Sequence, residues 1–231
     1  MEETQPPPSQ PGYQSSTGNY NAIAQGGNAT VNINMPVNER RWLKPARLTL
    51  GSKPFVGRQE LVESLIAELS AGNNVAITGK QLVKAVQGMG GIGKTYLALK
   101  LAIELYDYFP GGVIRLDVGP QVIDETSAQV PLGRLASYAF GGLSPLGSFQ
   151  PEQVASWLAE TAPGPFLVIF DDLWRPEPLR FLSRALPPMA ILLVTTRFTN
   201  VAQAIGAALV SLDRLTPEDG LALPGEFCLP A

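Results

Sequence analysis

The sequence predicts a three-layer α/β fold, in which helices cover both faces of a mostly parallel, doubly wound sheet. Two observations support this fold class. Short apolar runs such as "FLVIF" and "ILLV" lack the alternation of apolar and polar residues that marks a strand with one face in water, so they suit strands buried on both faces. Segments with apolar residues at helical spacing lie between these runs. Strands that alternate with helices build βαβ units, and hence a parallel sheet.

Length and composition limit the chain to one such domain and a tail. With 231 residues, of which 45% are apolar, two large domains do not fit. The net charge is −3, and the lysines and arginines are scattered, which favours no nucleic-acid partner for this segment. Histidine is absent and Cys228 is the single cysteine, so the usual zinc-ligand sets are excluded. With no secretory signal and no apolar run long enough to cross a bilayer, we expect a cytoplasmic protein without a membrane partner.

The N-terminal residues 1–36 predict a disordered tail, because they are rich in Pro, Gln, Ser, Gly and Asn and would bury little apolar surface. Residues 18–36 have a second interpretation. In "TVNINM" apolar residues alternate with asparagines, which is the pattern of a strand with one apolar and one amide face. Uncharged segments of this kind suit in-register stacking between chains. Disorder in an isolated chain and stacking in clustered chains both stay open.

Residues 37–54, "VNERRWLKPARLTLGSKP", are interpreted as a linker, with Trp42 and Leu43 docking it onto the domain. The helical pattern begins directly afterwards. Apolar residues in "QELVESLIAELS" recur at helical spacing and predict a helix over about 59–70. Gly72 stands where this helix should stop.

The remaining strands and helices alternate along the chain. Strands are expected in the apolar runs at 74–79, 82–88, 112–118, 165–172, 190–196 and 207–212. Helices are expected at 94–109 and at about 131–140, 151–161, 176–186 and 199–205. Gln150 before Pro151 is a plausible helix start, since proline is tolerated in the first helical turn. The last residues, 216–231, lose helical periodicity and predict an irregular, truncated C-terminus.

The stretch "GMGGIGKT", residues 88–95, matches the phosphate-binding pattern GxxxxGK followed by Ser or Thr, and it lies between a predicted strand and a predicted helix. Glycines let the backbone curl so that successive N–H groups point at phosphate oxygens, and the helix N-terminus adds a positive dipole end. Lys94 supplies a charge to the β and γ phosphates, and the Thr95 hydroxyl can ligate magnesium. The alternative is a glycine turn that binds nothing, which the strand, lysine and threonine together disfavour.

The stretch "FLVIFDD" delivers Asp171 and Asp172 at the carboxyl end of a buried strand. Buried carboxylates are costly unless they meet a cation, and open α/β sheets bind ligands at this edge. We expect Asp171 to hold magnesium through water, and Asp172 to orient or polarise the attacking water. Alternatively, an acidic strand end can simply cap the next helix.

The stretch "ILLVTTR" places Arg197 at the end of another buried strand. An arginine at this position can reach a γ phosphate and report whether it is present. The alternative is an arginine that is merely solvated at a strand end.

Taken in order, "FVGRQE", "GMGGIGKT", "FLVIFDD" and "ILLVTTR" resemble the nucleotide-binding domain of the STAND class, the signal-transduction ATPases with numerous domains. Within that class the chain is most similar to the NB-ARC branch, shared by plant disease-resistance proteins, the apoptotic protease-activating factor and many bacterial relatives. The resemblance implies a P-loop NTPase fold for the domain at 55–215. It also implies that the "TTR" strand lies between the phosphate-loop strand and the acidic strand.

The resemblance assigns roles to individual residues. Those implied to lie against adenine and ribose are Phe55, Val56, Gly57 and Arg58. Those of the phosphate loop are Gly88, Gly90, Gly91, Gly93, Lys94 and Thr95. Thr95 and Asp171 are the implied magnesium ligands, and the implied catalytic set is Lys94, Asp171, Asp172 and Arg197, with Arg197 as first sensor.

Members of this family hold ADP at rest, exchange it for ATP and then oligomerise. The resemblance therefore implies a switch that binds ATP or ADP with Mg²⁺, hydrolyses ATP slowly and self-associates in a bacterial NLR-like signalling or defence system. Residues 18–36 resemble the short amyloid-signalling motifs that precede such domains in bacteria, which implies recruitment of a downstream effector. Two alternatives are a STAND-class transcriptional regulator whose DNA-binding module lies outside this chain, and a P-loop ATPase of another family, which the "VGR" and "TTR" pair disfavours.

The chain also departs from the family pattern. The family's nucleotide-binding domain is followed by a helical domain with a Gly-Leu-Pro-Leu signature and by a winged helix whose histidine contacts ADP. Neither the signature nor any histidine is present in this sequence. We therefore expect a truncated product that lacks the lobe closing over the nucleotide.

Overall fold

The computed structural model describes residues 40–50, 55–79, 93–145, 147–204 and 208–212. The predictions for the tail at 1–36, for a strand at 82–88 and for the C-terminus at 216–231 lie outside these residues. The described strands are β1 (Val75–Gly79), β2 (Val113–Asp117), β3 (Phe166–Leu173), β4 (Ala190–Thr196) and β5 (Ala208–Leu212). The described α-helices are α1 (Gln59–Ser70), α2 (Lys94–Glu104), α3 (Gln129–Ser137), α4 (Pro151–Thr161), α5 (Pro176–Ser183) and α6 (Thr199–Gln203). The described 3₁₀ helices are η2 (Tyr106–Tyr108) and η3 (Tyr138–Phe140).

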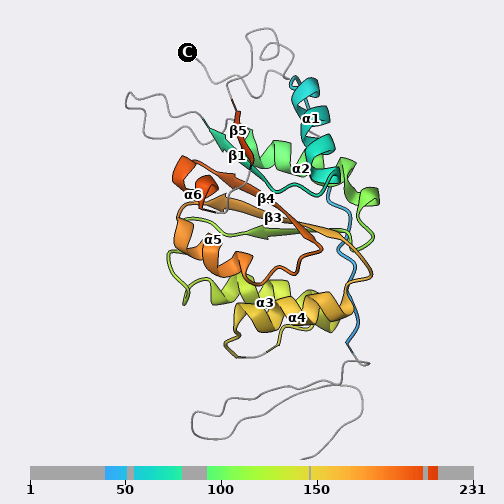
Figure 1. Cartoon of the computed structure of the whole chain (residues 1–231), viewed down its shortest axis with the longest axis vertical. Coiled ribbons are helices and arrows are strands. Elements are labelled where there is room, and N and C mark those ends of the chain that lie inside the picture. The colour runs from blue at the N-terminus through green and yellow to red at the C-terminus, as the bar shows by residue number, and fades with distance from the viewer. Residues whose placement is uncertain (1–39, 51–54, 80–92, 146, 205–207, 213–231) are drawn as a thin grey trace, which may run out of the picture. The chain divides into compact units, whose positions relative to one another are not determined.

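The strands form one parallel sheet in the order β2-β3-β4-β1-β5 (Figure 1). This confirms the predicted doubly wound α/β fold. The "TTR" strand, β4, lies between the acidic strand β3 and the strand β1. The strand expected beside β4 is the phosphate-loop strand, and the described strand at that position is β1, the "VAITG" run.

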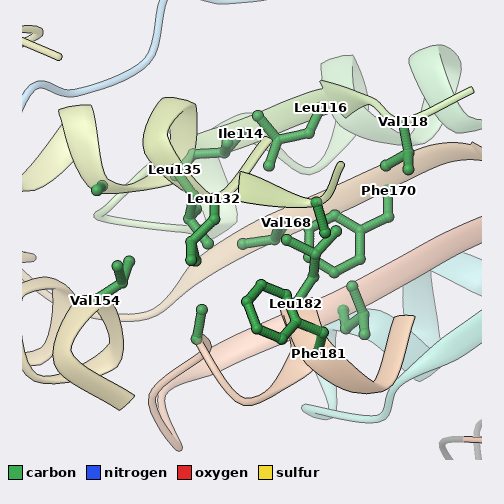
Figure 2. Packing of buried hydrophobic residues seen from close by; sticks show 14 of the residues in the cluster. Ile114, Leu116, Val118, Leu132, Leu135, Val154, Val168, Phe170, Phe181 and Leu182 are labelled. Atoms are coloured by element: carbon green, nitrogen blue, oxygen red, sulfur yellow. The ribbon is translucent and has the colours of Figure 1, made fainter. Parts of the chain in front are cut away.

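Helices cover both faces of the sheet, with α1 and α2 on one face and α3, α4 and α5 on the other (Figure 1). Because side chains alternate along a strand, each strand feeds two cores. On β2, Ile114 and Leu116 enter the core beneath α3 and α4 (Figure 2). Val113 enters the opposite core. On β3, Val168 and Phe170 face the first core. The uniformly apolar strands of the sequence are therefore buried on both faces, as expected.

Helix boundaries follow local backbone rules. Pro151 occupies the first turn of α4 after an extended Gln150, as the sequence predicts. The helix predicted at 94–109 is too long: α2 ends at Glu104, and Phe109 is extended because it precedes a proline, which disfavours the helical region for that residue. Gly72 follows α1 with φ 88°, the left-handed conformation that ends many helices and that glycine adopts without strain.

Two other helices are also divided or shortened. The helix predicted at about 131–140 is α3 followed by η3, and it ends at Gly141 in the left-handed region. The helix predicted at about 176–186 ends at Ser183, four residues before the Pro187 and Pro188 pair. Among the described residues, no helix is both long and apolar enough to cross a membrane.

The segment at 40–50 packs against the domain through Trp42. Its ring lies 5.1 Å from the Phe166 ring and 6.2 Å from the Tyr138 ring, and its indole N–H donates to the Gly111 carbonyl at 3.2 Å. The Leu43 side chain is 42% exposed, and the backbone N–H of this residue donates to the Tyr138 carbonyl. The predicted docking through Trp42 is confirmed, and Leu43 adds its backbone hydrogen bond and a side-chain approach to Gly142.

Trp42→Ala should lower the free energy of unfolding by about 2 kcal/mol, because it removes a half-buried ring that packs on two others. The matched control is Leu43→Ala, which should change stability by less than about 0.5 kcal/mol. Urea unfolding followed by circular dichroism measures both. Equal effects of the two substitutions would contradict this account of the docking.

Candidate functional site

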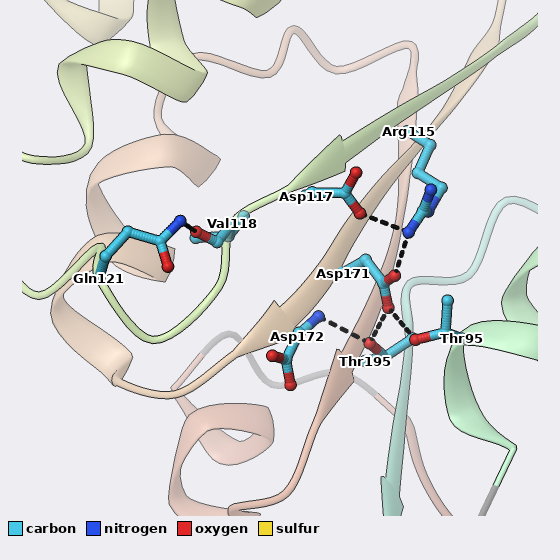
Figure 3. A network of polar contacts seen from close by, with 8 residues as sticks. All are labelled: Thr95, Arg115, Asp117, Val118, Gln121, Asp171, Asp172 and Thr195. Atoms are coloured by element: carbon cyan, nitrogen blue, oxygen red, sulfur yellow. Dashed lines mark hydrogen bonds and ion pairs between the residues drawn. The ribbon is translucent and has the colours of Figure 1, made fainter. Parts of the chain in front are cut away.

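The carboxyl ends of β2, β3 and β4 meet the first turn of α2 at one edge of the sheet (Figure 3). Strand alternation decides which side chains point toward this helix. Leu167 and Ile169 pack in the core beneath α1 and α2, so Asp171, two residues further on, points the same way. Leu193 lies in the same core, and the same spacing brings Thr195 to this side. Asp171 and Thr195 come together because each is the next residue on the strand face whose preceding side chains are apolar and buried beneath α1 and α2.

Asp171 is the centre of a hydrogen-bonded network (Figure 3). This residue is only 2% exposed. Its Oδ1 accepts from the Thr95 hydroxyl at 3.0 Å and from the Thr195 hydroxyl at 2.5 Å. Its Oδ2 accepts from Arg115 Nη2 at 2.6 Å, and the same guanidinium nitrogen contacts Asp117. One buried carboxylate thus ties β3 to β2, β4 and α2.

Asp172 lies in an irregularity of the sheet. Between Phe170 and Leu173, β3 advances three residues while β4 advances two, which is the register shift of a bulge. Asp172 has φ 56°, in the left-handed region, and its N–H donates to the Thr195 hydroxyl at 2.9 Å. The bulge breaks the alternation, so the two adjacent carboxylates can both serve this edge of the sheet.

Two further cations, besides Arg115, lie near these carboxylates. Lys94 is the first residue of α2 and is half-buried. Burial lowers its pKa, the positive charge of Arg197 lowers that pKa further, and the charges of Asp172 and Asp171 oppose this. Arg197 Nε lies 3.8 Å from Asp172 Oδ1. The residues predicted as catalytic are therefore brought together.

Trp174 adds a ring to this edge of the sheet. The Arg197 guanidinium carbon lies 5.1 Å from the centre of the Trp174 ring, and Phe198 packs on the same ring at 5.6 Å. In the part of the chain that the structure describes, Arg197 Nε and the indole nitrogen of Trp174 are buried without a hydrogen-bond partner. Buried donors are normally satisfied, so these two are suited to an acceptor-rich ligand.

The "FVGR" residues approach the same helix from the N-terminal side. Arg58, the residue before α1, has φ 63°. Its Nη1 lies 3.0 Å from the position that a Cβ on Gly93 would occupy, so it rests against the last glycine of the phosphate loop. Phe55 stacks on Tyr96 of α2 with ring centres 5.8 Å apart. Val56 and Gly57 join these two residues.

Arg58 and Asp172 are the two non-glycine residues of the described segments with positive φ. Such conformations cost energy and cluster at functional sites. Both were predicted as site residues from their motifs. The predicted loop residues Gly88, Gly90 and Gly91 lie outside the described segments, whereas Gly93 is described, with φ 92°.

Sequence reasoning missed Arg115, Asp117 and Thr195. Arg115 and Asp117 stand at alternate positions of a predicted strand, and a charged residue inside the apolar run "GVIRLDV" is the signal that could have found them. That signal becomes interpretable only once β2 is known to pair with β3, with Asp117 opposite Asp171.

The residues present fit a magnesium nucleotide. The Thr95 hydroxyl and the Asp171 carboxylate place oxygen atoms 3.0 Å apart at the N-terminus of a helix, and Mg²⁺ prefers oxygen ligands. Lys94, Arg197 and Arg58 supply positive charge around the same helix end, which suits phosphate groups.

The family model of the NB-ARC domain matches residues 58–230. The regulatory protein AfsR of Streptomyces griseus is 30% identical over 188 residues, which is 81% of this chain and 19% of that protein. AfsR of Streptomyces coelicolor is 31% identical over 182 residues, 78% of this chain and 18% of that protein. The chain thus spans about a fifth of the length of these relatives.

Solved structures with similar backbones include a chain from Drosophila ORC bound to AT-rich DNA and Cdc6. It has 13% sequence identity and a TM-score of 0.47, and the match covers 70% of this chain and 57% of that chain. Another is C. elegans PCH-2, with 14% identity, a TM-score of 0.38 and coverage of 70% and 45%.

Lys94→Met should raise the Tm of the nucleotide-free protein by roughly 1–3 °C at pH 7. Lys94 is desolvated, and it is a cation at a helix N-terminus, which is unfavourable. Because its folded-state pKa is lowered, the destabilisation is complete below that pKa. It fades as the pH rises through the higher pKa of the unfolded state, so the difference in Tm should shrink toward pH 10.

Lys100→Met, on the same helix, is the matched control for this stability test. Lys100 forms an ion pair with Glu104, so its replacement should leave the Tm unchanged or slightly lower. Differential scanning fluorimetry across pH 7–10 makes the comparison. A Lys94→Met protein that melts below the wild type at pH 7 would contradict the assigned cost of this lysine.

Proposed function

Because this chain belongs to the NB-ARC domain family of STAND-type P-loop NTPases, we propose that it binds ATP or ADP with Mg²⁺ and acts as a nucleotide-controlled signalling switch. The observation that carries the proposal is the convergence of Lys94, Thr95, Asp171 and Arg197 at one edge of the sheet. Parallel sheets bind ligands at this edge, and this one gathers both cation ligands and phosphate-binding charges.

Each side chain has a task in this proposal. Lys94 holds the β and γ phosphates, and Arg58, which rests against Gly93, contacts the adenine and ribose. The magnesium ion, when bound, would neutralise phosphate charge, and Thr95 with Asp171 would hold it. Asp172, whose side chain is 38% exposed, orients the attacking water.

Arg197 distinguishes the two nucleotides. Its guanidinium lies beside Asp172 and against Trp174, and its Nε has no hydrogen-bond acceptor among the described residues. A γ phosphate would supply that acceptor and pull the arginine away from Asp172. The nucleotide state then reaches the end of β4 through a single side chain.

Slow hydrolysis resets the switch, and the ATP state self-associates. The family membership supports this proposal. For the switch to work, ATP must bind the self-associating state more tightly than the resting state. Recruitment of an effector through residues 18–36 completes the proposed signalling path, and those residues lie outside the described segments.

A second candidate is a STAND-class transcriptional regulator, because both curated relatives bear the name regulatory protein. In this reading the nucleotide switch is the same and the DNA-binding module belongs to chain beyond these residues. Light scattering of the full-length protein with ADP and with ATP, followed by DNA retention under both conditions, separates the two. ATP-dependent self-association without DNA retention favours the signalling scaffold.

Lys94→Ala should weaken ADP and ATP binding at least a hundredfold, because it removes the phosphate-binding charge. Isothermal titration calorimetry in the presence of Mg²⁺ measures it. Arg184→Ala, which removes an exposed charge paired with Glu152, is the control and should bind like the wild type. Unchanged affinity in the Lys94 variant would remove the basis of the proposed function.

Arg197→Ala should lower the affinity for a non-hydrolysable ATP analogue about tenfold and change the ADP affinity less than twofold, since the lost contact is to the γ phosphate. Arg184→Ala, an exposed arginine paired with Glu152, should alter neither affinity. Competition with a fluorescent ADP measures both. Equal losses for the two nucleotides would show that Arg197 binds without sensing.

A further inference from the structure

Arg115 is the residue of the Asp171 network that the proposed function does not use. It reaches from β2 over the end of β3, and its Nη2 lies between two carboxylates (Figure 3). One is Asp171, with a side chain that is 3% exposed, and the other is Asp117, with a side chain that is 67% exposed. A single guanidinium nitrogen therefore links a buried carboxylate to a solvated one.

The buried partner needs this charge when no cation is present. An ionised carboxylate that is removed from water costs several kcal/mol unless it is paired and hydrogen-bonded. The hydroxyls of Thr95 and Thr195 satisfy Oδ1 of Asp171, but they carry no charge. Arg115, whose Nη2 lies 2.6 Å from Oδ2, supplies the positive charge that this carboxylate needs.

The same contact opposes a divalent cation. A metal ion that binds to Asp171 would lie close to the positively charged guanidinium of Arg115, whose Nη2 is 2.6 Å from Oδ2. Like charges this close repel strongly in a partly buried site. Nucleotide phosphates near Lys94 add negative charge and offset this repulsion. Magnesium should consequently bind well only together with the nucleotide.

Asp117 is a second carboxylate with which the Arg115 guanidinium can form an ion pair. It stands two residues after Arg115, so both side chains lie on the same side of β2, and it pairs in register with Asp171. When Asp171 turns to a cation, Arg115 keeps its contact with Asp117 and needs no large movement.

We propose that Arg115 is a positioning residue that makes magnesium binding at Asp171 depend on bound nucleotide, with Asp117 as its alternate partner. The inference rests on the proposed function, because it assumes that Asp171 serves a magnesium nucleotide. Arg115 makes no contact with substrate in this proposal. It acts on magnesium through the charge and hydrogen bonding of Asp171.

The direct test measures Mn²⁺, as a probe for Mg²⁺, by electron paramagnetic resonance of the free ion with and without ADP. Arg115→Gln should bind Mn²⁺ about five- to tenfold more tightly than the wild type in the absence of nucleotide. The factor by which ADP strengthens Mn²⁺ binding should fall correspondingly. Arg115→Lys keeps the positive charge, so its Mn²⁺ affinity should lie closer to that of the wild type than the affinity of Arg115→Gln does.

Asp117→Asn gives an independent arm, because this side chain is exposed and its replacement leaves the buried network intact. With Asp117 neutral, Arg115 has Asp171 as its remaining carboxylate partner in this network, so Mn²⁺ binding should weaken about threefold or more. In the Arg115→Gln background the same substitution should have a clearly smaller effect. A double-mutant cycle isolates that coupling.

Equal Mn²⁺ affinity of the wild type and Arg115→Gln, or an Asp117→Asn effect that is the same in both backgrounds, would overturn the inference. ADP titrations of the wild type with and without Mg²⁺ accompany the experiment. A wild type that binds no ADP contradicts the proposed function itself. A wild type that binds ADP, with an unaltered magnesium effect in Arg115→Gln, contradicts the role of Arg115 alone.

Discussion

The buried carboxylate of Asp171 is the constraint around which this edge of the molecule is arranged. A charge that is 2% exposed must be compensated, and the compensation comes from three other elements: the first turn of α2, the end of β4 and the middle of β2. The hydrogen bonds that satisfy this carboxylate also fix how the three elements meet. The carboxylate that we propose as a cation ligand therefore also holds these elements together.

The position of this joint follows from the sheet. Parallel strands bring their carboxyl ends to one edge, and side-chain alternation extends the apolar rows beneath α2 into polar groups at that edge. The bulge after Phe170 interrupts the side-chain alternation at one residue, so that Asp172 and Asp171 can both lie at this edge of the sheet. The left-handed backbone of Asp172 is a local cost that the hydrogen bond from its N–H to Thr195 helps to offset.

The sequence was sufficient for whatever depends on local pattern. The buried strands, the start of α4 at Pro151 and the motif carboxylates all follow from periodicity, proline chemistry and spacing. Helix ends were harder to predict. The extended backbone of Phe109, for example, is set by the following proline and not by the apolar character of Phe109 itself. Arg115 could not be predicted as a partner of Asp171, since the pairing of β2 with β3 joins residues 56 positions apart in the chain.

The charges of Lys94, Arg115 and Asp171 link this site to the proposed binding of a magnesium nucleotide. Burial makes the charge of Lys94 unfavourable, and nucleotide phosphates would offset that cost. Arg115 pairs with Asp171 and would repel a cation that arrives without those phosphates. The most direct measurement is ADP affinity, by calorimetry, with Mg²⁺ and with a chelator, for the wild type and Asp171→Asn. This account predicts that Mg²⁺ tightens ADP binding to the wild type and has little effect on the variant. The same magnesium effect in both proteins would contradict the assignment of Asp171 as the residue that organises the site.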